Sequence, residues 1–131
     1  MADKNKVPVG SIGWVDLTVP NAQQLKKFYE EVVGWESAPV SMGDYNDFTM
    51  ISPDDKLPYA GVCHAKGTNS GLPPFWLIYI NVADIEKSVK KVKELGGEVL
   101  FEPKEMGNYG KYCVIKDTAG AFCALFEPIS Q

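Results

Sequence analysis

Residues 14–19 of this chain, WVDLTV, are matched 63 positions later by residues 77–82, LIYINV. Both stretches are rich in β-branched and aromatic residues, which predicts a strand in each. A residue that favours helix N-caps follows each strand, Asn21 in the first case and Asp84 in the second. Gln24 stands three residues after Asn21, which is the spacing of a capping box.

An amphipathic helix is predicted after each cap. Apolar residues recur there at intervals of three and four, so they share one helical face that we expect to be buried. These residues are Leu25, Phe28, Tyr29 and Val32 in the first half and Ile85, Val89, Val92 and Leu95 in the second. Gly34 and Gly97, again 63 residues apart, are expected to end the two helices.

Three further strands are predicted after each helix, separated by turn residues. They cover residues 35–40, 48–52 and 59–64 in the first half and residues 98–101, 111–116 and 121–126 in the second. Each half therefore has the pattern βαβββ, and the 63-residue offset needs no gap. We predict one α+β domain over residues 1–131, with halves at about 8–65 and 75–128 and a linker at 66–74.

Composition excludes several classes of protein. The 131 residues carry a net charge of −4, and all thirteen basic residues are Lys, so nucleic-acid binding is not expected. No apolar run is long enough to span a membrane, and the polar start Met1–Lys6 does not resemble a signal peptide, so a cytoplasmic location is expected. Cys63, Cys113 and Cys123 have no metal-ligand spacing and are expected to be reduced core residues.

The repeated βαβββ unit resembles the vicinal-oxygen-chelate superfamily, which holds the glyoxalase, bleomycin-resistance and extradiol-dioxygenase folds. The chain is most similar to the bacterial branch usually called "glyoxalase-related predicted enzymes". The matching stretches are FYEEVVGW at 28–35, AGV at 60–62, WLIYINVAD at 76–84, LGG at 95–97 and DTAGA at 117–121. The resemblance implies a cupped, half-barrel-like mixed sheet with helices outside, and one pocket lined by both halves.

Metal-using members of this superfamily take His, Gln or Glu ligands from the first and last strands of each half. Carried onto this chain, the four positions hold Trp14, Gly61, Leu77 and Ala124, and none of these side chains ligates a metal. Asp16 with Cys63 is a poor substitute. We therefore expect no cofactor, and a divalent metal is disfavoured.

Alternation along the strands places a set of side chains on the same inward face. The candidate ligand-binding residues are Trp14, Asp16, Thr18, Leu77, Tyr79 and Asn81. Trp14 and Leu77 have packing between the halves as an equal alternative. Asp16 is solvated, paired with a Lys, or functional, and Asp16 and Tyr79 are the candidate catalytic acid and base.

Other polar features have more ordinary interpretations. His64, the single histidine, and its repeat equivalent Glu127 are expected to face solvent or a loop edge. Residues 104–110 form either a flap over the pocket or, more simply, a hairpin loop.

Two functions follow, and a third is open. The first is a glyoxalase- or bleomycin-resistance-like protein that binds a small organic molecule without the usual metal. The alternative is a lyase, isomerase or dioxygenase-type enzyme with atypical metal ligands or with acid–base catalysis by Asp16 and Tyr79. A dimerisation module is the third. A homodimer is expected in each case, because the strand edges of an open sheet need cover.

Overall fold

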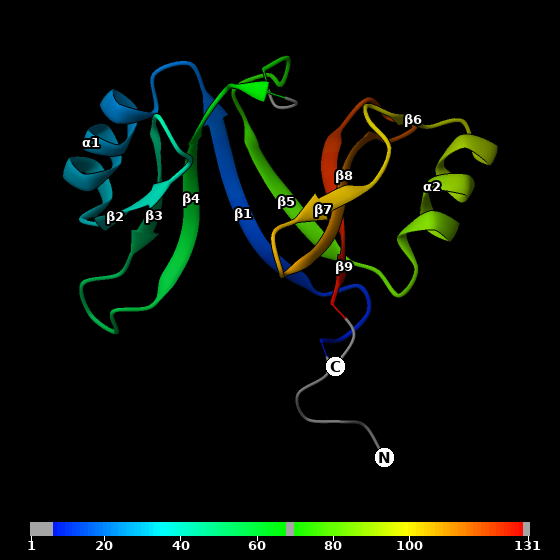
Figure 1. The fold of residues 1–131 in the computed structure, drawn as a ribbon, viewed down its shortest axis with the longest axis horizontal. Helices are drawn as coiled ribbons and strands as arrows, with labels where there is room; N and C mark the ends of the chain where they lie inside the picture. The colour runs from blue at the N-terminus through cyan, green and yellow to red at the C-terminus, as the bar shows by residue number, and fades with distance from the viewer. Residues whose placement is uncertain (1–6, 68–69, 130–131) are drawn as a thin grey trace. The chain divides into compact units, whose positions relative to one another are not determined.

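The computed structural model describes residues 7–67 and 70–129 (Figure 1). The first six residues and positions 68–69 of the predicted linker lie outside this part. In chain order the elements are β1 (Ile12–Val19), α1 (Ala22–Val33), β2 (Glu36–Ser41), β3 (Asn46–Ile51), β4 (Pro58–His64), β5 (Trp76–Asn81), α2 (Ile85–Glu94), β6 (Glu98–Val99), β7 (Lys104–Met106), β8 (Gly110–Lys116) and β9 (Phe122–Pro128). The α+β class predicted from the sequence is confirmed.

The chain divides into two compact units. One holds residues 14–76, which we call the N-unit. The other, the C-unit, holds residues 77–129 together with residues 7–13. The boundaries lie within β1 and β5 rather than in the linker, because the residues before Trp14 are hydrogen-bonded to β5: Gly10 N–H donates to the Asn81 carbonyl at 2.7 Å.

In the N-unit the strand order is β2-β3-β4-β1, with β1 and β4 parallel and the other pairs antiparallel. Helix α1 packs on one face, in contact with β2, β3 and β4 (Figure 1). That face carries the core, whose buried members are Leu17, Val19, Ala22, Phe48, Met50, Ala60 and Val62. The opposite face has no helix on it within the unit, and we call it the helix-free face.

The C-unit repeats this plan with one addition. Its strands run β5-β9-β8-β6, with β5 and β9 parallel and β7 added beside β8. Helix α2 packs over a core of Ile85, Val89, Cys113, Ile115 and Leu125. The segment 104–110 was predicted as a hairpin loop or a flap, and it is a hairpin: β7 pairs with the start of β8 across the turn at 107–109. The short strand β7 itself was not predicted.

Strand registers test the repeat directly. Asp16 pairs with Gly61 in the N-unit, and Tyr79 pairs with Ala124 in the C-unit, so each partner has its equivalent 63 residues later. The offset fails for the middle strands, since Thr49 pairs with Gly61 but Val114 pairs with Ala124. The expectation of a repeat without gaps is therefore wrong in the middle of each half. The C-unit has two more residues between α2 and β8 than the N-unit has between α1 and β3.

The helix ends differ from the predictions in detail. Asp84 caps α2, accepting from the Lys87 N–H at 3.2 Å, as predicted. The Asn21 side chain makes no capping bond and donates instead to Gln24 Oε1 at 2.9 Å, so the predicted capping box is wrong. The left-handed residue that ends α2 is Gly96, with φ of 93°, and not Gly97.

The predicted apolar helix faces are also partly wrong. Leu25 and Tyr29 pack on the N-unit core. Phe28 and Val32 are exposed, and so is Leu95 after α2. In α1 the helix is turned about its axis relative to the predicted orientation, so that Lys26 and Glu30 contact the sheet, as described below.

Candidate functional site

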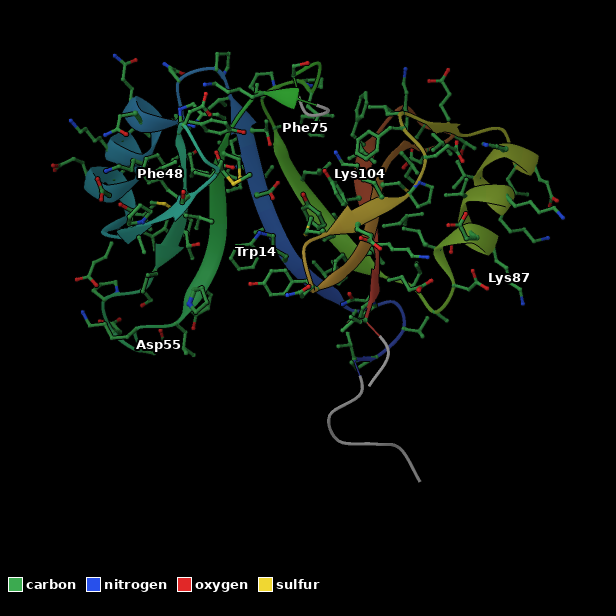
Figure 2. The ribbon with its side chains drawn as sticks, in the orientation of Figure 1. Trp14, Phe48, Asp55, Phe75, Lys87 and Lys104 are labelled. Carbon is green, nitrogen blue, oxygen red and sulfur yellow. The ribbon has the colours of Figure 1, made fainter. Side chains whose placement is uncertain are left out.

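Three of the predicted site residues lie together on β1 in the N-unit. Because Asp16 pairs with Gly61 and Thr18 with Cys63, alternation puts Trp14, Asp16 and Thr18 on the helix-free face. The neighbouring residues Val15, Leu17 and Val19 belong to the α1 side. Figure 2 labels Trp14 on this strand and Phe48 on the side of α1.

Gly61 lies at the centre of a group of side chains on this face. A Cβ atom placed on Gly61 would lie 3.1 Å from Asp16 Cβ, 3.4 Å from Trp14 Nε1 and 3.6 Å from Cys63 Sγ. The indole, the Asp16 side chain and the thiol therefore converge on one glycine, and a larger residue there would crowd them. Asp16 and Thr18 are 8% and 5% exposed, so the face carries buried polar groups.

The electrostatics of this face are acidic. Burial raises the pKa of the Cys63 thiol, and the charges of Asp16 and Asp47 raise it further. Cys63 is therefore a neutral thiol at physiological pH and no nucleophile. The carboxylates supply the negative character of the face.

The other three predicted residues lie on β5 in the C-unit. Leu77, Tyr79 and Asn81 are all buried and share with Ala124 and Phe126 of β9 the face of the C-unit sheet that is opposite α2. The Asn81 amide donates to Ser11 Oγ at 3.1 Å and to the Ser11 carbonyl at 3.3 Å. Its hydrogen-bonding capacity is directed at the chain segment before β1, which gives Asn81 a structural role.

Tyr79 belongs to an aromatic group that the sequence did not reveal. Its ring centroid lies 6.3 Å from that of Tyr112, and Tyr112 lies edge-on to Phe101 at 5.4 Å. The Lys104 ammonium stands over both Phe101 and Tyr112, at 5.5 and 5.7 Å from the ring centroids. The sequence could not predict that Phe101 and Lys104 contact Tyr112, because this contact depends on the pairing of β7 with β8.

The superfamily's metal positions do not suit a metal in this chain. Trp14 and Gly61 in the N-unit offer an indole and no side chain, and Leu77 and Ala124 in the C-unit are buried apolar residues. A longer side chain at Gly61 would start against Asp16 and Trp14. Among the described residues, no group of three or more His, Cys, Asp or Glu is arranged to hold a metal ion.

The sequence predicted that His64 faces solvent or a loop edge. In the structure it does not face solvent. Its side chain is 16% exposed, its backbone N–H donates to Asp47 Oδ1 at 2.8 Å, and its ring Nδ1 lies 3.4 Å from the same oxygen. The ring also packs edge-on against Tyr45. The sequence missed Asp47 as the partner because β3 and β4 meet only in the folded sheet.

Glu127, the repeat equivalent of His64, is likewise committed to the fold. Its Oε1 accepts from the Ile85 N–H at 2.9 Å, at the first residue of α2. A carboxylate in this place satisfies one of the free N–H groups of the helix and favours its positive end.

Two shallow hollows lie elsewhere in the C-unit. One, of about 270 Å³, lies beside β7, β8 and the end of β9, and the other, of about 350 Å³, lies between α2 and the sheet. None of the six predicted binding residues lines either hollow.

The comparison with known proteins agrees with this geometry. A family model described as the glyoxalase/bleomycin resistance protein/dioxygenase superfamily matches residues 11–124. The chain belongs to this superfamily. The resemblance drawn from the sequence is therefore confirmed. No helix among the described residues is long and apolar enough to cross a membrane.

Curated relatives are similar over most of the chain. "Putative glyoxylase CFP32" of Mycobacterium bovis is 30% identical over 129 residues, which is 97% of this chain and 49% of that protein. "Anthracycline biosynthesis protein DnrV" of Streptomyces peucetius is also 30% identical, over 90% of this chain and 47% of its own length. This chain thus spans about half the length of these relatives. YurT of Bacillus subtilis is 32% identical over 72% of this chain and 80% of its own length.

Solved structures share the fold. Methylmalonyl-CoA epimerase from Mycobacterium tuberculosis superposes with a TM-score of 0.56 at 13% identity, covering 96% of this chain and 95% of that one. A Streptomyces coelicolor methylmalonyl-CoA epimerase variant gives 0.61 at 14% identity, with coverages of 94% and 100%. At this identity the likeness concerns the fold alone.

Proposed function

We propose that the protein binds a small organic molecule at the helix-free face of the N-unit, through Trp14, Asp16 and Thr18, without a metal at the superfamily positions. The observation that carries the proposal is that the Trp14 indole and the buried Asp16 side chain meet beside Gly61, with the buried Thr18 next on the same face of β1. An aromatic wall with a few placed polar groups is the usual composition of a small-molecule site.

The chemistry of these groups selects the ligand. Asp16 is acidic, and a buried carboxylate is stabilised by a positive charge or by hydrogen-bond donors. Trp14 offers a large apolar surface that favours ring stacking and attracts cations. The best match is a molecule with an aromatic or apolar body that carries an amino or other hydrogen-bond-donating group. Relatives named for glyoxylase activity and anthracycline biosynthesis support a small organic ligand in general.

The test uses pairs of aromatic compounds that differ only in an amino group, measured by calorimetry or thermal shift. Asp16→Asn is expected to weaken the amines at least about tenfold and to leave their neutral partners unchanged, since a hydrogen bond to a charged group contributes about 1.5–3 kcal/mol. Asp54→Asn, at an exposed turn position, is the matched control and should change neither. Equal binding of both members of each pair to the wild type would contradict the role of Asp16.

Product analysis of every compound that binds decides between binding and turnover. The proposal expects each ligand to be recovered unchanged. Conversion of a ligand that is abolished in both Asp16→Asn and Tyr79→Phe would instead support the acid–base enzyme predicted as the alternative.

A further inference from the structure

Helix α1 exposes apolar side chains that an isolated unit would be expected to bury, and it covers a charged one. Phe28 and Val32, four residues apart on one ridge, are 55% and 64% exposed. The side chain of Lys26, in contrast, is only 14% exposed. The helix thus hides part of its polar side and presents part of its apolar side.

Contacts with the sheet explain this rotation. Glu30 accepts a hydrogen bond from Ser37 Oγ of β2 at 2.8 Å and pairs with Lys26 at 3.5 Å. The Lys26 ammonium lies 5.1 Å from the centroid of the Phe48 ring in β3. These contacts hold the Lys26–Glu30 side against the sheet. Because Phe28 and Val32 lie roughly 100° around the helix from Ala22, on the other side, they are turned outward.

We propose that this outer face of α1, centred on Phe28 and Val32, is the surface on which a second copy of the chain docks. Adjacent exposed apolar side chains mark an interaction surface more often than isolated ones do. The Phe28 ring lies edge-on to that of Tyr29, with 5.2 Å between the ring centroids, and Tyr29 packs on the N-unit core. The outer face is therefore in contact with the core.

Charge on the same face selects a second copy as the partner. Lys27 and Glu31 are exposed and lie to one side of Phe28 and Val32 around the helix, with the same four-residue spacing. In an antiparallel twofold pair of α1 helices, Phe28 of one copy faces Val32 of the other, and Lys27 of each copy faces Glu31 of its partner. The surface is therefore self-complementary, as a twofold interface requires.

Strand edges, from which a dimer was first expected, are less suitable. Strand β2 is the edge of the N-unit and has Pro39 at its middle, where a proline leaves the outward edge without a donor. At the far edge of the C-unit, β6 and β7 have only two and three residues. Short and proline-bearing edges resist pairing with another sheet.

Sedimentation equilibrium of the full chain across a dilution series tests the proposal. The wild type is expected to dimerise, and Phe28→Ser is expected to raise the dimer dissociation constant at least about tenfold, as loss of a central aromatic contact does. Leu57→Ser, which changes an equally exposed apolar side chain in the loop before β4, is the matched control and should leave the constant unchanged. A wild type that is monomeric throughout overturns the proposal, as does a dimer that Phe28→Ser leaves intact.

Charge reversal gives a second readout that keeps the apolar surface. Lys27→Glu should weaken the dimer, and the double variant Lys27→Glu with Glu31→Lys should restore it, because the reciprocal pairs are re-formed. Lys90→Glu, at the equivalent position of α2, should have no effect. A double variant as weak as the single one overturns the twofold arrangement. Circular dichroism of each variant confirms that it is folded.

Discussion

Gly110 shows how a single residue can be fixed by the backbone of its neighbour. It has a φ of 152°, and a Cβ atom there would meet the Glu127 carbonyl oxygen and the Phe126 ring inside contact distance. Gly110→Ala should therefore lower the free energy of unfolding by about 2–3 kcal/mol, through crowding and an unfavourable backbone conformation. Gly71→Ala, where no atom lies within 4 Å, should change it little. Urea denaturation of both variants, with the midpoints compared, checks the difference.

Cys113 makes the stability depend on pH in the alkaline range. Burial raises the pKa of its thiol from an ordinary 9.0 to about 11. The neutral thiol is favoured in the folded state, so this contribution is complete below pH 9 and is lost as the pH rises to 11. Unfolding free energies measured from pH 8 to 11 should fall less steeply in Cys113→Ala than in the wild type. Parallel curves for the two proteins would show that the thiol does not titrate in this way.

Residue faces on β1 were predictable and their partners were not. The two-residue period of a strand was enough to place Trp14, Asp16 and Thr18 together. The period did not predict that His64 would be mostly covered, because its environment is decided by Asp47 on another strand and by Tyr45 in the turn before that strand. Contacts of this kind depend on register and loop geometry, which no local pattern contains.

The two helices have equivalent N-caps that hold them differently. Asp84 accepts a backbone N–H of α2, whereas the Asn21 side chain turns to Gln24 and caps nothing in α1. Asp84→Ala should cost about 1 kcal/mol of stability, the usual loss for an occupied cap, and Asn21→Ala clearly less. Thermal and urea unfolding of the pair measure the contrast. Equal losses would mean that the side-chain bond at Asp84 contributes nothing.

Elements with a strong local signal were found, and those defined by pairing were missed. The strands around 14–19 and 77–82 and both helices follow from composition and periodicity. Strand β7, Lys104–Met106, has neither alternation nor β-branched residues, and it exists because β8 lies beside it. The rotation of α1 has the same origin, since its hydrophobic periodicity is outweighed by Glu30 and Lys26 contacting the sheet.

For the whole chain, the 63-residue repeat predicted the fold, and the composition leaves few residues that could ligate a metal. The single histidine is engaged with Asp47, and the superfamily's four ligand positions are without donors in both units. A cofactor-free protein stays a prediction at this level, and it concerns every metal ion rather than one site. It is best tested on the intact protein.

Metal removal should therefore leave the stability unchanged. A ligand that binds only the folded state adds about 2.7 kcal/mol at a hundredfold excess over its dissociation constant, which moves the Tm by several degrees in a chain of this size. Dialysis against a chelator, followed by separate addition of Mg²⁺, Mn²⁺, Ni²⁺ and Zn²⁺, should shift the Tm by less than about 1 °C, because residues 7–67 and 70–129 form no donor set of the required type and number. Elemental analysis of the purified protein should agree, with far less than one ion per chain. One bound ion per chain, with a Tm that falls on chelation and recovers with the same ion, would show that the chain has assembled a donor set outside the superfamily's four positions.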